Sequence, residues 1–256
     1  MRIPKQRRHT LLFLREVRPF APVFLDTEVD MTAVLAHRAA AGKRYSLVSY
    51  VLRAAGEVLA RHPEANAAVR GTRIAHYPAV HGKLTLDKHI DGCRVVLSTV
   101  VEDVDTAGLE EIQRQVERHR DSDPATMPDY AGVRLLHRVP GPVAGVLYRL
   151  GVRPLGRRPR VFGTVAVTSL GHRAVDSFHS VGGTTVTLGV GRVLDRPVAA
   201  DGAVAVAPVM RLSLAFDHRV IDGAEAADVL TEIKQALESC LERPETDEAA
   251  AAEAAR

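Results

Sequence analysis

The stretch Arg211-Leu-Ser-Leu-Ala-Phe-Asp-His-Arg-Val-Ile-Asp-Gly223 combines a strand, a polar turn and the start of a helix. Its apolar first half is typical of a β-strand, which brings Asp217 and His218 to the strand end. Apolar side chains then recur at helical spacing over 223–241, so a helix is expected to begin at the glycine. A histidine at a strand end can reach into a cleft while its neighbours stay packed.

The side chains of this stretch suggest acid–base chemistry. Imidazole can accept a proton at neutral pH because its ordinary pKa is about 6.5. His218 could therefore deprotonate a thiol, hydroxyl or amine as that group attacks a thioester carbonyl. Asp222 follows four residues later, so one turn could bring its carboxylate back towards the imidazole. The spacing His-x-x-x-Asp is a weak signal alone, whereas the string Asp-His-Arg-Val-Ile-Asp-Gly over 217–223 is much more specific.

This longer string resembles the active-site motif of the acyltransferase core of 2-oxoacid dehydrogenase complexes, a family that shares its fold with chloramphenicol acetyltransferase. Residues 24–35 resemble its first core strand and helix, 46–66 its second helix, and 160–171 its strand that ends in Ser-Asn-Leu-Gly. The resemblance covers about residues 10–242. It implies an α+β fold (an α/β sandwich) like that of chloramphenicol acetyltransferase, with a mixed sheet flanked by helices, in a trimer-forming chain.

The resemblance also implies a catalytic set. By position, His218 resembles the general base of the family, and Asp222 resembles the carboxylate that fixes the local geometry, commonly through an arginine partner. The candidates for that partner in the arm are Arg8, Arg15 and Arg18, and Arg15 is favoured slightly over the other two. A solvated arm arginine is the simpler alternative.

The family uses a hydroxyl to hydrogen-bond the oxyanion that develops in the transition state. In the tract Val-Thr-Ser-Leu-Gly over 167–171, Thr168 takes the place of that hydroxyl, and Ser169 replaces the asparagine and remains a rival for the role. Gly223 is expected to permit the tight turn beneath the histidine, and Asp217 to be a structural residue of the site.

The resemblance implies partners as well. Coenzyme A or acyl-CoA is the expected substrate, and a lipoyl domain or acyl carrier acting in trans is a candidate partner. A homotrimer or higher assembly is expected, with His218 and Thr168 contributed by neighbouring chains. Neither a lipoyl domain nor a subunit-binding domain is found ahead of the core, so a free-standing core is expected. An alternative function of a different class is that of a catalytically lapsed trimeric scaffold or partner-binding protein.

Composition narrows the class of protein. The chain has 256 residues, of which 46% are hydrophobic and 25% charged, as expected for one domain with a sizeable core. A net charge of +3 and the lack of Trp do not call for nucleic-acid binding. Cys93 and Cys240 lie far apart and are expected to be small buried residues, so neither a metal site nor a disulfide framework is expected. With no secretory signal or membrane span, a cytoplasmic location is expected.

The chain divides into an arm over 1–20, a catalytic domain over 21–243 and a tail over 244–256 that is predicted to be disordered. Residues 121–160 depart from the family as an insertion, in which an apolar helical stripe precedes several arginines. We favour a helical hairpin packed on the core with a solvated basic end, and the sharper alternatives are membrane-surface contact through 135–160 or a site for an anionic carrier. The stripe comprises Leu135, Leu136, Val139, Val143, Val146, Leu147 and Leu150.

Periodicity and turn signals predict the remaining elements, and Asp91-Gly92 predicts a tight hairpin. The predicted strands are 23–29, 83–90, 93–101, 161–168, 182–193, 204–209 and 211–216, with two short ones within 66–80, and the predicted helices are 30–41, 45–61, 109–120 and 223–241.

Overall fold

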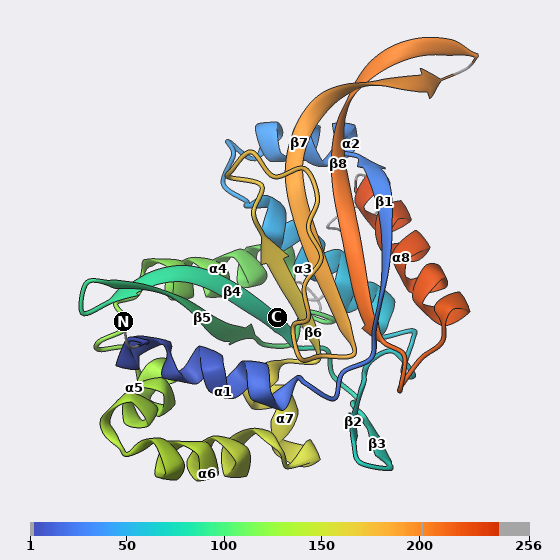
Figure 1. The fold of residues 1–256 in the computed structure, drawn as a ribbon. Helices are drawn as coiled ribbons and strands as arrows, with labels where there is room; N and C mark the ends of the chain where they lie inside the picture. The colour runs from blue at the N-terminus through green and yellow to red at the C-terminus, as the bar shows by residue number, and fades with distance from the viewer. Residues whose placement is uncertain (1–2, 201, 241–256) are drawn as a thin grey trace, which may run out of the picture.

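The computed structural model describes residues 3–200 and 202–240 and is built around a six-stranded mixed sheet (Figure 1). The strand order is β1-β8-β7-β6-β4-β5, in which β6 runs parallel to both β4 and β7 and the other pairs are antiparallel. The strands of this sheet are β1 (Pro22–Asp30), β4 (Gly82–Ile90), β5 (Cys93–Val101), β6 (Val165–Ser169), β7 (Val186–Ala200) and β8 (Ala203–Asp217), and a separate hairpin comprises β2 (Ala67–Arg70) and β3 (Arg73–His76).

Helices form two groups around the sheet (Figure 1). The first group shares one hydrophobic core with the sheet and comprises α2 (Thr32–Ala40), α3 (Leu47–Leu59), α4 (Leu109–Asp121) and α8 (Gly223–Glu238). The second group lies at one end of the sheet and comprises α1 (Arg8–Glu16), α5 (Ala131–Arg138), α6 (Gly141–Val152) and α7 (Arg158–Phe162), with short 3-10 turns at Lys5–Arg7, Pro128–Tyr130 and Leu155–Arg157. The expected mixed sheet flanked by helices is confirmed.

Local sequence signals account for several element boundaries. Ser46 caps α3 because its hydroxyl accepts the backbone N–H of Ser49 at 3.3 Å. The β4–β5 hairpin turns at Asp91 and Gly92, whose φ angles are 49° and 73°. Positive φ at both central residues is what a two-residue turn of this hand requires, so the predicted hairpin is confirmed.

The strands around the site differ from the prediction. The predicted strand over 161–168 begins only at Val165, because residues 158–162 form α7, with Pro159 in its first turn and Gly163 ending it at a φ of 67°. The predicted strand over 182–193 starts at Val186 and continues to Ala200 as β7. Its expected first residues instead turn, since Gly183 has a φ of 83°.

The insertion over 121–160 does form helices, but they do not pack as expected. Helices α5 and α6 bury Leu136 and Ala144 against Leu12 of α1, in a small core separate from the main one. Most of the predicted apolar stripe is exposed instead, including Val146 and Leu150. The expectation that the stripe packs on the main core is therefore wrong.

Two further expectations concern the cysteines and the tail. Cys93 and Cys240 are both free thiols, and each is partly exposed, so neither is the fully buried residue that the sequence predicts. The tail over 244–256 and the predicted last residue of the C-terminal helix lie outside the described residues.

Lys83 on β4 is a buried cation that joins the second helix group to the sheet. Its side chain lies between the rings of Phe13 and Phe162, with Nζ 4.4 and 4.5 Å from the ring centroids. The ammonium donates a hydrogen bond to the backbone carbonyl of Gly182 at 2.8 Å. Burial, with a smaller contribution from nearby Arg158, lowers the pKa of Lys83 to about 7.

Replacement of Lys83 by methionine should change how stability depends on pH. Because the unfolded lysine has a pKa of 10.5 and the folded one about 7, the unfolded state binds more protons between these values. The free energy of unfolding should therefore rise with pH in this window, by up to about 1.4 kcal/mol per unit from this group. Urea unfolding at pH 7, 8 and 9 should show that Lys83→Met removes this slope and that Lys5→Met, at an exposed position, keeps it. Equal slopes in Lys83→Met and the parent would contradict this account.

Candidate active site

His218 follows the last residue of β8 and begins the turn that leads to α8. Its backbone N–H donates a hydrogen bond to the carbonyl of Ala21 at 2.9 Å, which fixes the main chain against the segment before β1. The imidazole lies 5.5 Å from the ring of the buried Phe216, while 48% of the His218 side chain is exposed. The predicted placement at a strand end is confirmed, and solvent or a substrate can reach the ring.

Asp222 turns back towards the imidazole, as the spacing predicts. Its Oδ1 lies 3.3 Å from Nδ1 of His218, and 88% of the carboxylate side chain is exposed. Gly223 is the first residue of α8, and an added Cβ there would meet no atom within 4 Å. Its φ is not in the left-handed region, so the backbone at this position can be adopted by other residues, and the expected role of Gly223 in the turn stays a prediction.

Asp217 holds the main chain around the histidine. This carboxylate is 2% exposed and accepts hydrogen bonds from Nε and Nη2 of Arg219 at 2.8 and 2.5 Å. It also accepts the backbone N–H of Ala21 at 3.4 Å. The bond to Asp217 raises the pKa of Arg219, and the bidentate pair fixes the turn on both sides of the histidine.

Arg219 is an arginine that the structure places at the site, whereas the sequence favours Arg15 as the partner of Asp222. Arg15 is exposed on α1, and within the described chain no ion pair joins it to Asp222. Arg219 pairs with Asp217 instead. The sequence signal for this pair was the Asp-x-Arg spacing at the end of a strand. Residues two apart in a turn can place their side chains on the same side of the chain.

Thr168 lies near the carboxyl end of β6 and is partly exposed. Its hydroxyl donates a hydrogen bond to the hydroxyl of Thr85 at 3.2 Å, because the parallel pairing of Leu84 with Val167 places the two threonines side by side. Thr168 and Ser169 both line a cavity of about 720 Å³, so the structure keeps both as candidates. Sequence reasoning missed Thr85, since only the strand pairing reveals it.

Within one chain the predicted base and the predicted oxyanion hydroxyl are far apart. Strands β6 and β8 are antiparallel to each other, so their carboxyl ends lie at opposite ends of the sheet (Figure 1). Thr168 pairs with Gly189 on β7, and Gly189 pairs with Ser213 on β8. Two strand spacings, and the rise along β8 from Ser213 to His218, give a backbone separation of roughly 19 Å. Both side chains of one chain cannot reach the same carbonyl, because each must lie about 3 Å from an atom of the reacting groups.

Comparison with known families identifies the part of the chain that holds both residues. Residues 162–243 match the family model of the 2-oxoacid dehydrogenases acyltransferase (catalytic domain). Over these residues the chain is similar to this acyltransferase family. The match includes β6, β7, β8 and α8, and so contains Thr168 and His218.

Individual relatives agree with the family match. The dihydrolipoyllysine-residue succinyltransferase component of the 2-oxoglutarate dehydrogenase complex of Escherichia coli (strain K12) is 27% identical over 201 residues, which are 77% of this chain and 42% of that protein. The chain thus spans less than half the length of this curated relative. The family resemblance expected from the sequence is confirmed.

Solved structures share the fold of this chain. The dihydrolipoamide acetyltransferase of Azotobacter vinelandii, studied for the role of a serine, a histidine and an asparagine in its catalytic mechanism, superposes with a TM-score of 0.67 at 20% identity, covering 94% of this chain and 92% of that one. A chloramphenicol acetyltransferase superposes with a TM-score of 0.54 at 14% identity, covering 92% and 96%. The predicted fold is confirmed.

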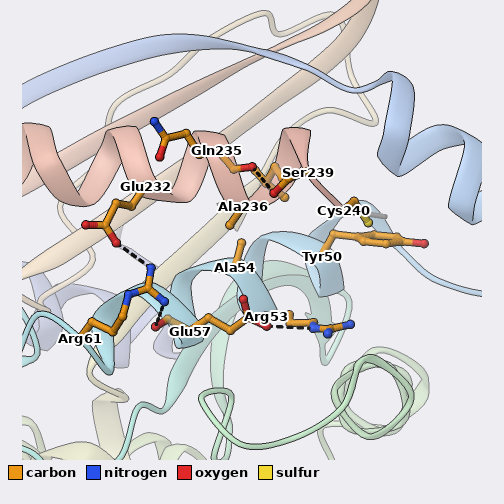
Figure 2. A pocket seen from close by; sticks show the side chains of 11 residues that line it. Tyr50, Arg53, Ala54, Glu57, Arg61, Glu232, Gln235, Ala236, Ser239 and Cys240 are labelled. Carbon is orange, nitrogen blue, oxygen red and sulfur yellow. Dashed lines mark hydrogen bonds and ion pairs between the residues drawn. The ribbon is translucent and has the colours of Figure 1, made fainter. Parts of the chain in front are cut away.

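The described part of the chain has a further cavity of about 360 Å³ between α3 and α8 (Figure 2). Arg61 and Glu232 form an ion pair of 2.6 Å there. Burial raises the pKa of Tyr50 to about 12 and raises that of the Cys240 thiol, so neither is prepared to exchange protons near neutral pH. Within 3–200 and 202–240, no cluster of three or more His, Cys, Asp or Glu side chains could hold a metal ion.

Proposed function

We propose that this chain moves an acyl group between a coenzyme A thioester and a thiol, with His218 as the general base. The observation that carries the proposal is the accessible imidazole at the end of β8, with Asp222 3.3 Å from Nδ1, inside the segment that matches the acyltransferase family. The names of the relatives point to a dihydrolipoyl thiol as the partner of coenzyme A. In the Azotobacter enzyme, the histidine and the asparagine studied for their catalytic role are also four residues apart.

The reaction requires His218 to take one proton from the attacking thiol and later to give one proton to the departing thiolate. Nε2 of His218 removes the proton from the attacking thiol, and the sulfur forms a bond to the thioester carbonyl carbon. The carbonyl oxygen becomes an oxyanion in the tetrahedral intermediate. When the carbon–sulfur bond of the original thioester breaks, the imidazolium returns the proton to the departing thiolate. No covalent intermediate with the protein forms, so both substrates must be bound together.

The rest of the chain positions the base. The Asp217–Arg219 pair and the His218 N–H bond to Ala21 hold the main chain of the turn, while the exposed carboxylate of Asp222 lies beside Nδ1. A carboxylate at that place favours a proton on Nδ1 and leaves Nε2 free to act as the base.

The oxyanion donor comes from a second copy of the chain in this proposal. Thr168, with Ser169 as its rival, lies at the opposite end of the sheet from His218 in the same chain. A trimer in which β6 of one protomer approaches β8 of its neighbour would bring the hydroxyl and the imidazole to one carbonyl. The cavity of about 720 Å³ beside Thr168 offers space for part of a substrate.

The alternative is a catalytically lapsed scaffold of the same fold. Two observations favour it: Ser169 stands where the family has asparagine, and Asp222 has no arginine partner within the described chain. The intact string from Asp217 to Gly223 favours catalysis, because a scaffold needs the fold but has no use for an exposed imidazole beside a carboxylate.

Acyl transfer itself separates these two functions. Incubation with acetyl-CoA or succinyl-CoA and dihydrolipoamide should produce the acylated dihydrolipoamide, which mass spectrometry detects, at a rate far above that without protein. Acyl-CoA should also raise the thermal unfolding temperature, since a ligand at 100 times its Kd adds about 2.7 kcal/mol of stability. Thermal protection without turnover for any acyl-CoA would support the scaffold, and the absence of both would contradict the proposed substrate.

A further inference from the structure

Helix α6 carries an apolar ridge that faces solvent. The four side chains of the ridge recur at positions i, i+3, i+4 and i+7 on one face of the helix. They are Val143 (45% exposed), Val146 (54%), Leu147 (36%) and Leu150 (63%). The opposite face of α6 buries Ala144 and Val152. The helix is therefore apolar on both faces, and the described part of the chain covers only one of them.

The region around the ridge is strongly cationic. Between Asp129 and Asp176 there is no Asp or Glu, and the segment contains Arg134, Arg138, Arg149, Arg153, Arg157, Arg158, Arg160 and Arg173. The one carboxylate of α1, Glu16, is already paired with Arg153 at 2.9 Å. The segment that contains the ridge thus carries several arginines and no carboxylate of its own.

A groove joins the ridge to the arm helix. It has a volume of about 450 Å³ and lies between α1 and α6, with Leu11 and Val146 among its apolar residues and Arg8, Arg15 and Arg149 at its edge. Arg8 donates to the carbonyl of Leu136, whereas Arg15 and Arg149 have no polar partner among the described residues. Two unpaired guanidinium groups therefore lie beside exposed aliphatic side chains.

We propose that the α6 ridge docks the protein on a membrane surface that contains anionic lipid. An aliphatic ridge can enter the region of the acyl chains while the neighbouring arginines bind lipid phosphates. Helix α6 lies at the outer edge of the molecule, away from the sheet, where a flat surface can approach it (Figure 1). No helix in residues 3–200 and 202–240 is long and apolar enough to cross a bilayer.

Charge and composition disfavour the other occupants. A symmetric contact between two copies would bring the arginine-rich surfaces together, with no carboxylate between Asp129 and Asp176 to offset them. The ridge itself is made of Val and Leu, and it has none of the aromatic side chains in which protein interfaces concentrate binding energy. Lipid chains accept such side chains without a shape-matched pocket.

Vesicle sedimentation tests the proposal with matched variants. The protein should sediment with vesicles of phosphatidylcholine and phosphatidylglycerol, much less with phosphatidylcholine alone, and less as salt rises. The double variant Leu150→Ser, Arg149→Gln removes one apolar contact and one cation, so partitioning should fall about tenfold or more. The control Ile74→Ser, Arg73→Gln changes an exposed pair on β3 and should bind like the parent.

All four substituted positions are exposed, so both variants should fold. A difference in vesicle binding can then be assigned to the ridge and not to misfolding. The absence of sedimentation with anionic vesicles, or equal binding by the ridge variant and the control, would overturn the proposal. If the ridge variant instead loses self-association in analytical ultracentrifugation while vesicle binding is unchanged, the ridge is a contact between copies and the proposal is wrong. Acyl transfer in solution should be the same for both variants, which separates this test from that of the catalytic proposal.

Discussion

Replacement of His218 by alanine should lower kcat/KM for acyl transfer by about 10²–10⁴-fold, because a positioned general base contributes that much to the rate. The variant should keep the thermal unfolding temperature of the parent, since 48% of the side chain is exposed and its main-chain bond to Ala21 does not need the imidazole. Steady-state transfer from acyl-CoA to dihydrolipoamide measures the effect.

A matched control distinguishes loss of the base from a general effect of removing a histidine. His89 lies exposed on β4, outside the matched segment, so His89→Ala should transfer acyl groups at the parental rate. A folded His218→Ala variant that retains more than about a third of the parental kcat/KM would be incompatible with general-base catalysis by this residue.

Replacement of Thr168 by valine should lower kcat by about 10²–10³-fold with little change in KM, because an oxyanion donor acts mainly in the transition state. Valine keeps the shape of threonine and removes only the hydroxyl, which in the structure donates to Thr85. Separate measurement of kcat and KM therefore tests the role of the hydroxyl more closely than alanine would.

Ser169 provides the comparison for this prediction. If Thr168 is the donor, Ser169→Ala should retain most of the parental kcat. A large loss of kcat in Ser169→Ala together with a near-parental Thr168→Val would reverse the assignment between these neighbours, which both line the same cavity.

The sequence predicted the elements in which one local pattern decides the structure. The string from Asp217 to Gly223 correctly indicated a strand end, a turn and a helix start, because its apolar and polar residues separate cleanly. Asp91-Gly92 predicted its hairpin for the same reason, since few other residues tolerate positive φ at both places.

The errors arose where distant parts of the chain decide the structure. The run before β6 was predicted as strand but forms α7, whose buried Phe162 packs against Lys83 from β4. The neighbour of Thr168 is Thr85, and 83 positions separate the two in sequence. The stripe over 135–150 was predicted to face the core, because periodicity shows that a helix is amphipathic but not what covers its apolar face.

Arg15 illustrates a different limit. Its position in the arm suggested a partner for Asp222, yet the structure pairs Arg219 with Asp217 and leaves Arg15 beside the α6 ridge. A motif fixes residues that are close in sequence, such as Asp217 and Arg219. It does not fix a pair whose two members lie on separate elements, because their distance depends on the packing of everything between them.

The activity of mixed oligomers tests most directly whether one reaction site is built from His218 of one chain and Thr168 of another. His218→Ala and Thr168→Val chains, refolded together in equal amounts, should recover about a quarter of the parental activity, since a quarter of randomly formed interfaces pair an intact histidine with an intact threonine. Activity that stays at the average of the two separate variants would contradict a shared site.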